Sequence, residues 1–128
     1  MYRGKNRRRH PRYGVGSLRV WVHRRGVAAL FGKRCEVTPI DFSSMGMAFR
    51  CVRPLAPGER LVCDFIKDHH RVINVVGVVR EITRLANHCR VGIEFDFEAD
   101  DHMRAPETKA GLRVIETLLK DVVVVGGA

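Results

Sequence analysis

Residues 90–97, RVGIEFDF, carry the clearest structural pattern in the 128-residue chain. Apolar side chains stand at every second position of this stretch: Val91, Ile93, Phe95 and Phe97. Arginine, glycine and acidic residues occupy the positions between them. Successive side chains of a β-strand point to opposite faces, so this alternation predicts a half-buried strand with its apolar face against a core.

Five further stretches upstream have the same strand character. They are residues 17–23, 34–38, 46–51, 61–66 and 71–82. The segment PLAPGE at 54–59 separates two of them and is typical of a turn, because proline fixes φ and glycine relaxes the backbone. Six short strands with turns between them predict a mainly β fold, an antiparallel barrel or sandwich. The chain has no alternating strand and helix units, so a parallel α/β sheet is disfavoured.

The apolar period becomes helical near the C-terminus. Pro106 suits the first position of a helix, and Glu107 suits its positive N-terminal end. One face of the predicted helix is apolar: Leu112, Ile115, Leu119 and Val122, with Leu118 beside it. We expect this helix to cover one opening of the β structure. The β-branched run 122–125 should weaken it, and Gly126 and Gly127 should end the ordered chain.

Positive charge is concentrated in the N-terminal part of the chain. The formal net charge is +9, and residues 1–35 contain eleven Lys or Arg and no acidic residue. The remaining residues carry a small negative balance. Residues 1–16, rich in Arg and Gly, are therefore expected to form a flexible basic arm, and residues 17–128 a single domain. Such a block of charge favours a phosphate-bearing or otherwise anionic partner.

The cysteines and the hydropathy pattern indicate the cellular compartment in which the protein is expected to reside. None of Cys35, Cys51, Cys63 and Cys89 forms a Cys-x-x-Cys pair. The basic start is followed by no long apolar segment, so we expect neither a secretory signal nor a membrane span. Reduced thiols in a cytoplasmic protein are the simplest interpretation, without a disulfide framework.

Two local motifs point to a ligand. Arg8 and Arg12 form an R-x-x-x-R spacing in the basic arm, and Asp41, Ser43 and Gly46 form a D-x-S-x-x-G motif between two predicted strands. In order and spacing the two motifs resemble the PilZ family. The stretch 91–95 resembles the family's closing strand and the C-terminal helix is in the expected place, so the resemblance covers roughly residues 7–120.

The resemblance implies a six-stranded antiparallel β-barrel that binds the bacterial second messenger cyclic di-GMP. It also implies an arginine arm that folds over ligand held on the barrel and changes the surface offered to a separate downstream protein. Family outputs include motility and the surface polysaccharides and adhesion of biofilms. Arg7, directly before the motif, implies two stacked ligand molecules. Arg80 occupies a position where relatives often present a Trp or Arg to guanine.

The chemistry of these residues suits the same ligand, which has two phosphates and two guanines. A guanidinium fork pairs bidentately with phosphate oxygens, reaches the O6 and N7 acceptors of guanine or lies flat on the base. The carboxylate of Asp41 can accept from guanine N1–H and N2–H₂, and the Ser43 hydroxyl adds an adaptable partner. Gly46 allows a tight turn or close approach of the backbone. The predicted ligand-binding residues are Arg7, Arg8, Arg12, Asp41, Ser43, Gly46 and Arg80.

Other interpretations remain open at this stage. The arm could be a solvated tail, Asp41 and Ser43 a simple capping turn, and Arg80 a surface arginine. A nucleic-acid-binding barrel would explain the positive charge, but it should carry aromatic residues interleaved with the basic ones. A PilZ-like protein adaptor without ligand is another alternative. No metal site, cofactor or catalysis is expected, because the sequence has neither metal-ligand spacing nor a nucleophile elbow or P-loop.

Overall fold

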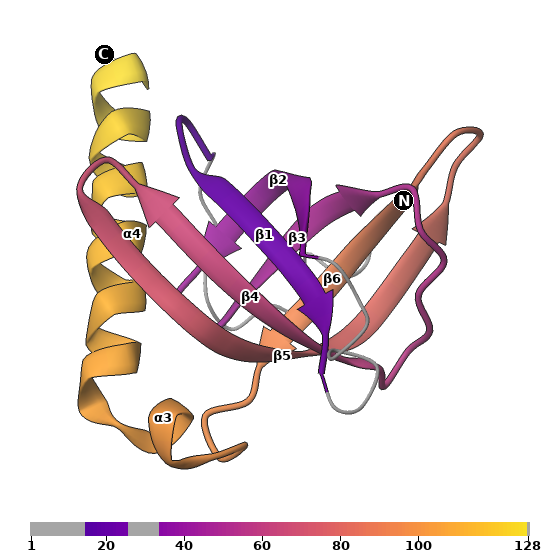
Figure 1. The fold of residues 1–128 in the computed structure, drawn as a ribbon. Helices are drawn as coiled ribbons and strands as arrows, with labels where there is room; N and C mark the ends of the chain where they lie inside the picture. Colours follow the sequence, from indigo (N-terminus) through magenta and orange to yellow (C-terminus); the bar gives the residue numbers. More distant parts are fainter. Residues whose placement is uncertain (1–14, 26–33, 128) are drawn as a thin grey trace.

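Six antiparallel strands form a closed barrel in the computed structural model, in the order β1-β2-β3-β6-β5-β4 (Figure 1). The structure describes residues 15–25 and 34–127, with side chains up to residue 120. The strands are β1 (Arg19–Arg24), β2 (Cys35–Ser43), β3 (Gly46–Cys51), β4 (Arg60–Lys67), β5 (His70–Arg84) and β6 (Cys89–Phe95). The predicted six-stranded barrel with a C-terminal helix is confirmed. The predicted arm falls mostly outside the described residues, so its boundary at residue 16 stays a prediction.

The core fills the barrel as the alternation predicts. Inward side chains of every strand are buried, and three rings meet at the centre. Phe65 lies with its ring centroid 5.3 Å from that of Phe42 and 5.6 Å from that of Phe95, both edge to face. Such pairs stabilise a core beyond the area that they bury. The alternation at 90–97 extends two residues past the strand, since β6 ends at Phe95 and Phe97 is only half-buried.

Register shifts interrupt three of the strand pairs. They lie between Pro39 and Asp41 on β2, between Cys63 and Phe65 on β4, and between Val79 and Glu81 on β5. A bulge inserts an extra residue on one strand, bends it and changes the direction of the neighbouring side chains. The predicted ligand residues Asp41 and Arg80 both lie at such irregularities.

One end of the barrel is covered by α4 (Pro106–Gly127). Its predicted apolar face is confirmed in the part with described side chains, where Leu112, Ile115 and Leu119 are fully buried. The helix continues through the β-branched run and ends at Gly127, the second of the two glycines predicted to end the ordered chain. None of the helices among the described residues is long and apolar enough to cross a membrane.

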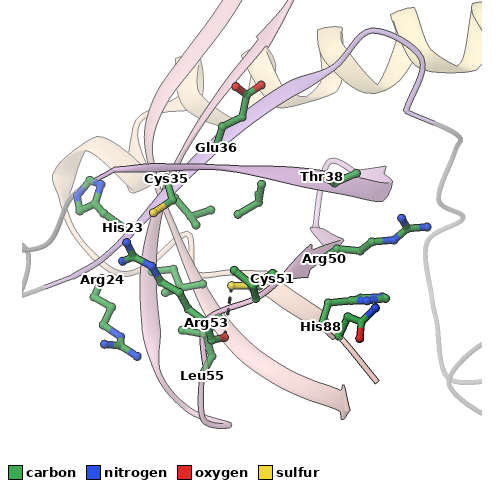
Figure 2. A pocket seen from close by; sticks show the side chains of 15 residues that line it. His23, Arg24, Cys35, Glu36, Thr38, Arg50, Cys51, Arg53, Leu55 and His88 are labelled. Atoms are coloured by element: carbon green, nitrogen blue, oxygen red, sulfur yellow. Dashed lines mark hydrogen bonds between the residues drawn. The ribbon is translucent and has the colours of Figure 1, made fainter. Parts of the chain in front are cut away.

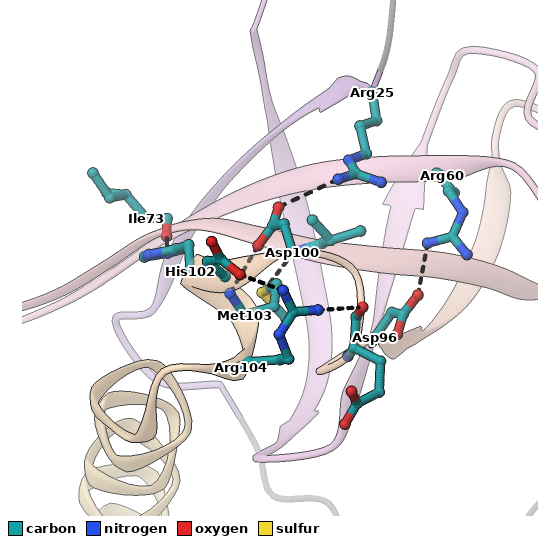
Figure 3. Close-up of polar contacts among 11 residues, drawn as sticks. Arg25, Arg60, Ile73, Asp96, Asp100, His102, Met103 and Arg104 are labelled. Atoms are coloured by element: carbon teal, nitrogen blue, oxygen red, sulfur yellow. Dashed lines mark hydrogen bonds and ion pairs between the residues drawn. The ribbon is translucent and has the colours of Figure 1, made fainter.

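A short helix, α3 (Asp101–Arg104), connects β6 to α4 and was not predicted. Asp100 caps it by accepting from the Met103 N–H at 2.8 Å. Two ion pairs attach this connection to the barrel: Arg25 with Asp100 at 3.3 Å and Arg60 with Asp96 at 2.7 Å (Figure 3). The connection therefore sets the direction in which α4 leaves the barrel.

Candidate ligand-binding site

The D-x-S-x-x-G motif forms the tight hairpin between β2 and β3. Ser43 pairs with Gly46 across the two-residue turn. The Ser43 hydroxyl is buried, accepts from the Met45 N–H at 3.1 Å and donates to the Gly46 carbonyl oxygen at 3.4 Å. Both hydrogen bonds lie inside the turn, so this hydroxyl shapes the hairpin. A direct contact between Ser43 and guanine stays a prediction.

Asp41 lies on the outer wall of the barrel, next to this hairpin. Its neighbour Phe42 points into the core, and the alternation of the strand directs Asp41 outward. Its Oδ1 accepts from the Ala48 N–H at 3.2 Å, and its Oδ2 lies 3.4 Å from the guanidinium of Arg90. The carboxylate is thus held in a fixed direction on the wall.

Arg90 was not among the predicted site residues. It stands on β6 directly opposite Arg50 on β3, and like charges in that register repel each other. Asp41 offsets part of that repulsion. The alternation of residues 90–97 already places Arg90 on the outer face of the barrel. Arg90 belongs to no motif, however, so the sequence did not single it out.

Arg80 lies on the same outer wall at the bulge of β5. Its Nε donates to Glu94 Oε1 at 3.0 Å, and the two side chains are 58% and 59% exposed. Glu94 in turn pairs with Gly46 of the hairpin. Two strand spacings of about 4.8 Å separate β5 from β3, so Arg80 stands about 10 Å from the hairpin.

Small residues occupy the wall between these polar groups. Ala48 of β3 pairs with Gly92 of β6, which pairs with Glu81 of β5. A flat group can approach the backbone closely over Ala48. Over Gly92 the Glu81 side chain is already in van der Waals contact, with its Oε1 3.6 Å from the position that a Cβ would occupy. The structure therefore brings Asp41, Ser43, Gly46 and Arg80 onto one side of the barrel. Arg7, Arg8 and Arg12 lie outside the described residues.

The hairpin also contacts α4. The backbone N–H of Ser44, inside the motif, donates to Glu116 Oε2 at 3.1 Å. This is a direct connection between the candidate site and the helix at the barrel end. Within the part of the chain that the structure describes, no group of three His, Cys, Asp or Glu could hold a metal ion.

Comparison with known proteins identifies the family of this chain and solved structures with a similar fold. A sequence model of the PilZ domain matches residues 6–106, so the chain belongs to the PilZ domain family. No curated protein matches the sequence. A solved structure described as the PilZ domain with c-di-GMP of YcgR from Escherichia coli is similar, with a TM-score of 0.68 and 16% identity, covering 94% of this chain and 97% of that one. MrkH, described as a c-di-GMP-dependent transcription regulatory factor, has a TM-score of 0.60 and 16% identity, covering 91% of this chain and 51% of that one.

Proposed function

We propose that this chain is a receptor for cyclic di-GMP that acts as an adaptor without catalysis. The observation that carries the proposal is the direction of Asp41, which the motif hairpin and the adjacent bulge aim at the outer wall that also holds Arg80. The family and the two similar proteins, both described with c-di-GMP, support it.

In this proposal the wall recognises the hydrogen-bond donors of a guanine base. Asp41 gives up its hydrogen bond to Arg90 and accepts instead from the N1–H and N2–H₂ groups of the guanine. Arg90 is then free to face a phosphate of the ligand. Ser43 and Gly46 hold the hairpin so that the base can approach. Arg80 leaves Glu94 to stack on the base, an exchange that costs little because an exposed ion pair contributes only about 0–1 kcal/mol.

The phosphates of the ligand would pair with the N-terminal arginines. Arg8 and Arg12 supply guanidinium forks at the spacing of the family motif, and Arg7 adds a third cation for a second stacked ligand molecule. A polyanion also relieves the repulsion among these charges. The arm then closes over the ligand and changes the surface of the barrel.

The change at the site can reach a partner through α4. Glu116 binds the hairpin backbone at Ser44, so a shift of the hairpin on ligand binding moves or releases the helix. The receptor would thus offer a different surface to a cytoplasmic protein. Control of motility or biofilm formation, as in other family members, would be the cellular output.

Titration calorimetry with cyclic di-GMP and cyclic di-AMP tests the proposal. Cyclic di-GMP should bind more tightly, because adenine lacks the N1–H and N2–H₂ donors and would leave Asp41 unpaired. Arg12→Ala and Asp41→Ala should each weaken binding about ten- to a hundredfold. Arg71→Ala, an exposed arginine of β5 near the α4 end, is the matched control and should bind normally.

Equal affinity for the two cyclic dinucleotides would overturn the role of Asp41. No binding at all would leave a PilZ barrel that acts as an adaptor without ligand. The same titration gives the stoichiometry, and a one-to-one ratio would contradict the stacked pair.

A further inference from the structure

Two like charges face each other on the candidate ligand wall. Arg50 of β3 lies directly opposite Arg90 of β6. In the same ladder the Phe95 N–H donates to the Met45 carbonyl oxygen at 2.9 Å, and hydrogen-bonded pairs alternate with non-hydrogen-bonded pairs along antiparallel strands. Counting from this bond makes Arg50 and Arg90 a non-hydrogen-bonded pair, in which the Cα atoms are only about 4.5 Å apart. Like charges at that spacing destabilise a sheet.

The described residues compensate this charge only in part. The guanidinium of Arg90 lies 3.4 Å from the carboxylate of Asp41. Across residues 15–25 and 34–120, the exposed side chain of Arg50 has no hydrogen-bond or ion-pair partner. The next residue, Cys51, lines a pocket of about 630 Å³ at the end of the barrel opposite α4, and Figure 2 shows the two side chains leaving β3 in different directions. Because side chains alternate along a strand, Arg50 points outward, onto the same wall as Arg90.

Hydroxyl groups extend this pair into a row across four neighbouring strands. Thr38 of β2 is the register partner of Arg50, and Thr83 of β5 is the register partner of Arg90. Both threonines are exposed. The row therefore presents two guanidinium forks flanked by two hydroxyls that can donate, and it contains no acidic residue.

The next outward row has the opposite chemistry. It consists of Asp41, Ala48, Gly92 and Glu81. Its polar groups are carboxylates, which accept hydrogen bonds. Successive rows on one face are two residues apart, or about 7 Å. A guanine nucleotide has the matching pattern, since a base that carries donors is joined through one sugar to a phosphate that accepts.

We propose that Arg50 and Arg90 form a clamp for one phosphodiester of the cyclic di-GMP molecule whose guanine binds at Asp41. This inference rests on the proposed function and extends it, because it assigns one phosphate to the barrel wall as well as to the arm. The guanine takes Asp41 from Arg90, and the two guanidinium forks then bind the nonbridging oxygens of the phosphodiester. The bound anion also relieves the repulsion between the two arginines. Binding of the base and binding of the phosphate thus reinforce each other.

Arg50 provides the cleanest test, because its removal breaks no contact among the described residues. In calorimetry with cyclic di-GMP, Arg50→Gln should weaken binding by about ten- to a hundredfold, the value of one charge-assisted hydrogen bond. Arg50→Lys keeps the charge without the fork and should lose less. Arg71→Gln, which removes an exposed arginine near the α4 end, is the matched control and should bind normally.

Two further measurements separate a clamp from a structural role. Urea unfolding of the free protein should show a slightly higher midpoint for Arg50→Gln, because the variant loses a like-charge pair. Phosphorus NMR of the bound ligand should show separate resonances for the two phosphodiesters, and Arg50→Gln should move one of them more than the other.

The outcomes distinguish the clamp from the receptor assignment. If the parent protein binds cyclic di-GMP and Arg50→Gln binds it equally well, the clamp is overturned and the proposed function stands. Weaker binding together with a lower urea midpoint would mean that Arg50 supports the fold, which also overturns the clamp. If the parent protein does not bind cyclic di-GMP, the proposed function and the clamp both fail.

Discussion

The two ends of the barrel use apolar surface in opposite ways. At the α4 end, the helix buries Leu112, Ile115 and Leu119 completely. At the other end, Val52 is 82% exposed and Leu85 is 51% exposed beside an open pocket. The same six strands thus supply one end that contributes stability and one that leaves apolar surface accessible. The candidate ligand wall runs between the two ends and contacts the closed one through Ser44 and Glu116.

The largest expected difference is in stability. Ile115→Ala removes a fully buried side chain of α4 and should lower the free energy of unfolding by about 2–5 kcal/mol. Val52→Ala at the open end should change it by less than about 0.5 kcal/mol. Urea unfolding of both variants compares the ends directly. Similar losses would mean that the open end is also packed in solution.

A second variant tests how closely α4 packs on β5. A Cβ at Gly111 would lie 2.8 Å from Val72 Cγ2, a methyl group on a stiff β-branched side chain. Gly111→Ala gains about 1 kcal/mol in helix propensity but should lose about 2 kcal/mol to overpacking. We expect a net loss of about 1 kcal/mol.

The partner side chain provides the control for Gly111. In a Val72→Ala background the obstructing methyl is absent, so Gly111→Ala should become stabilising by about 1 kcal/mol in the same unfolding measurement. An effect of the same sign in both backgrounds would contradict the close contact between α4 and β5.

The sequence predicted the elements better than it predicted the wall. Alternation in the strands and the apolar face of α4 follow from local periodicity, and both are confirmed. The bulges that direct Asp41 and Arg80 lie within the pairs β2–β3 and β5–β6, where one strand carries an extra residue that the alternation of its own side chains does not reveal. Arg90 went unnoticed for another reason: it belongs to no motif, and only the pairing of β6 with β3, which is distant in sequence, brings it to Asp41.

A smaller effect should connect the closed end to the ligand wall. Glu116→Ala removes the acceptor of the Ser44 N–H and frees the hairpin that carries the motif. If cyclic di-GMP binds the ordered hairpin, its affinity should fall about two- to tenfold, the value of one hydrogen bond. Thr117→Ala, an exposed neighbour on α4, is the control. Unchanged affinity in Glu116→Ala would separate the helix from the site.

The smallest effect concerns the connection that carries α4, and it depends on pH. The hydrogen bond from Arg60, helped by the Glu98 N–H, lowers the pKa of the Asp96 carboxyl below its ordinary value. A carboxyl with a lowered folded pKa stabilises the fold above its unfolded pKa, near 3.9, and this contribution disappears as pH falls through the folded pKa. Because Asp96 is partly exposed, we expect less than about 1 kcal/mol.

Asp96→Asn should therefore be slightly less stable than the parent protein at pH 7, and the difference should vanish in acid, below the folded pKa of Asp96. Glu98→Gln, an exposed neighbour in the same connection, should follow the parent at every pH. Unfolding by urea across this range measures both variants. A deficit in Asp96→Asn that persists in acid would mean that its carboxylate matters for packing and not for its charge, and that Arg60 does not hold the connection to the barrel by ion pairing.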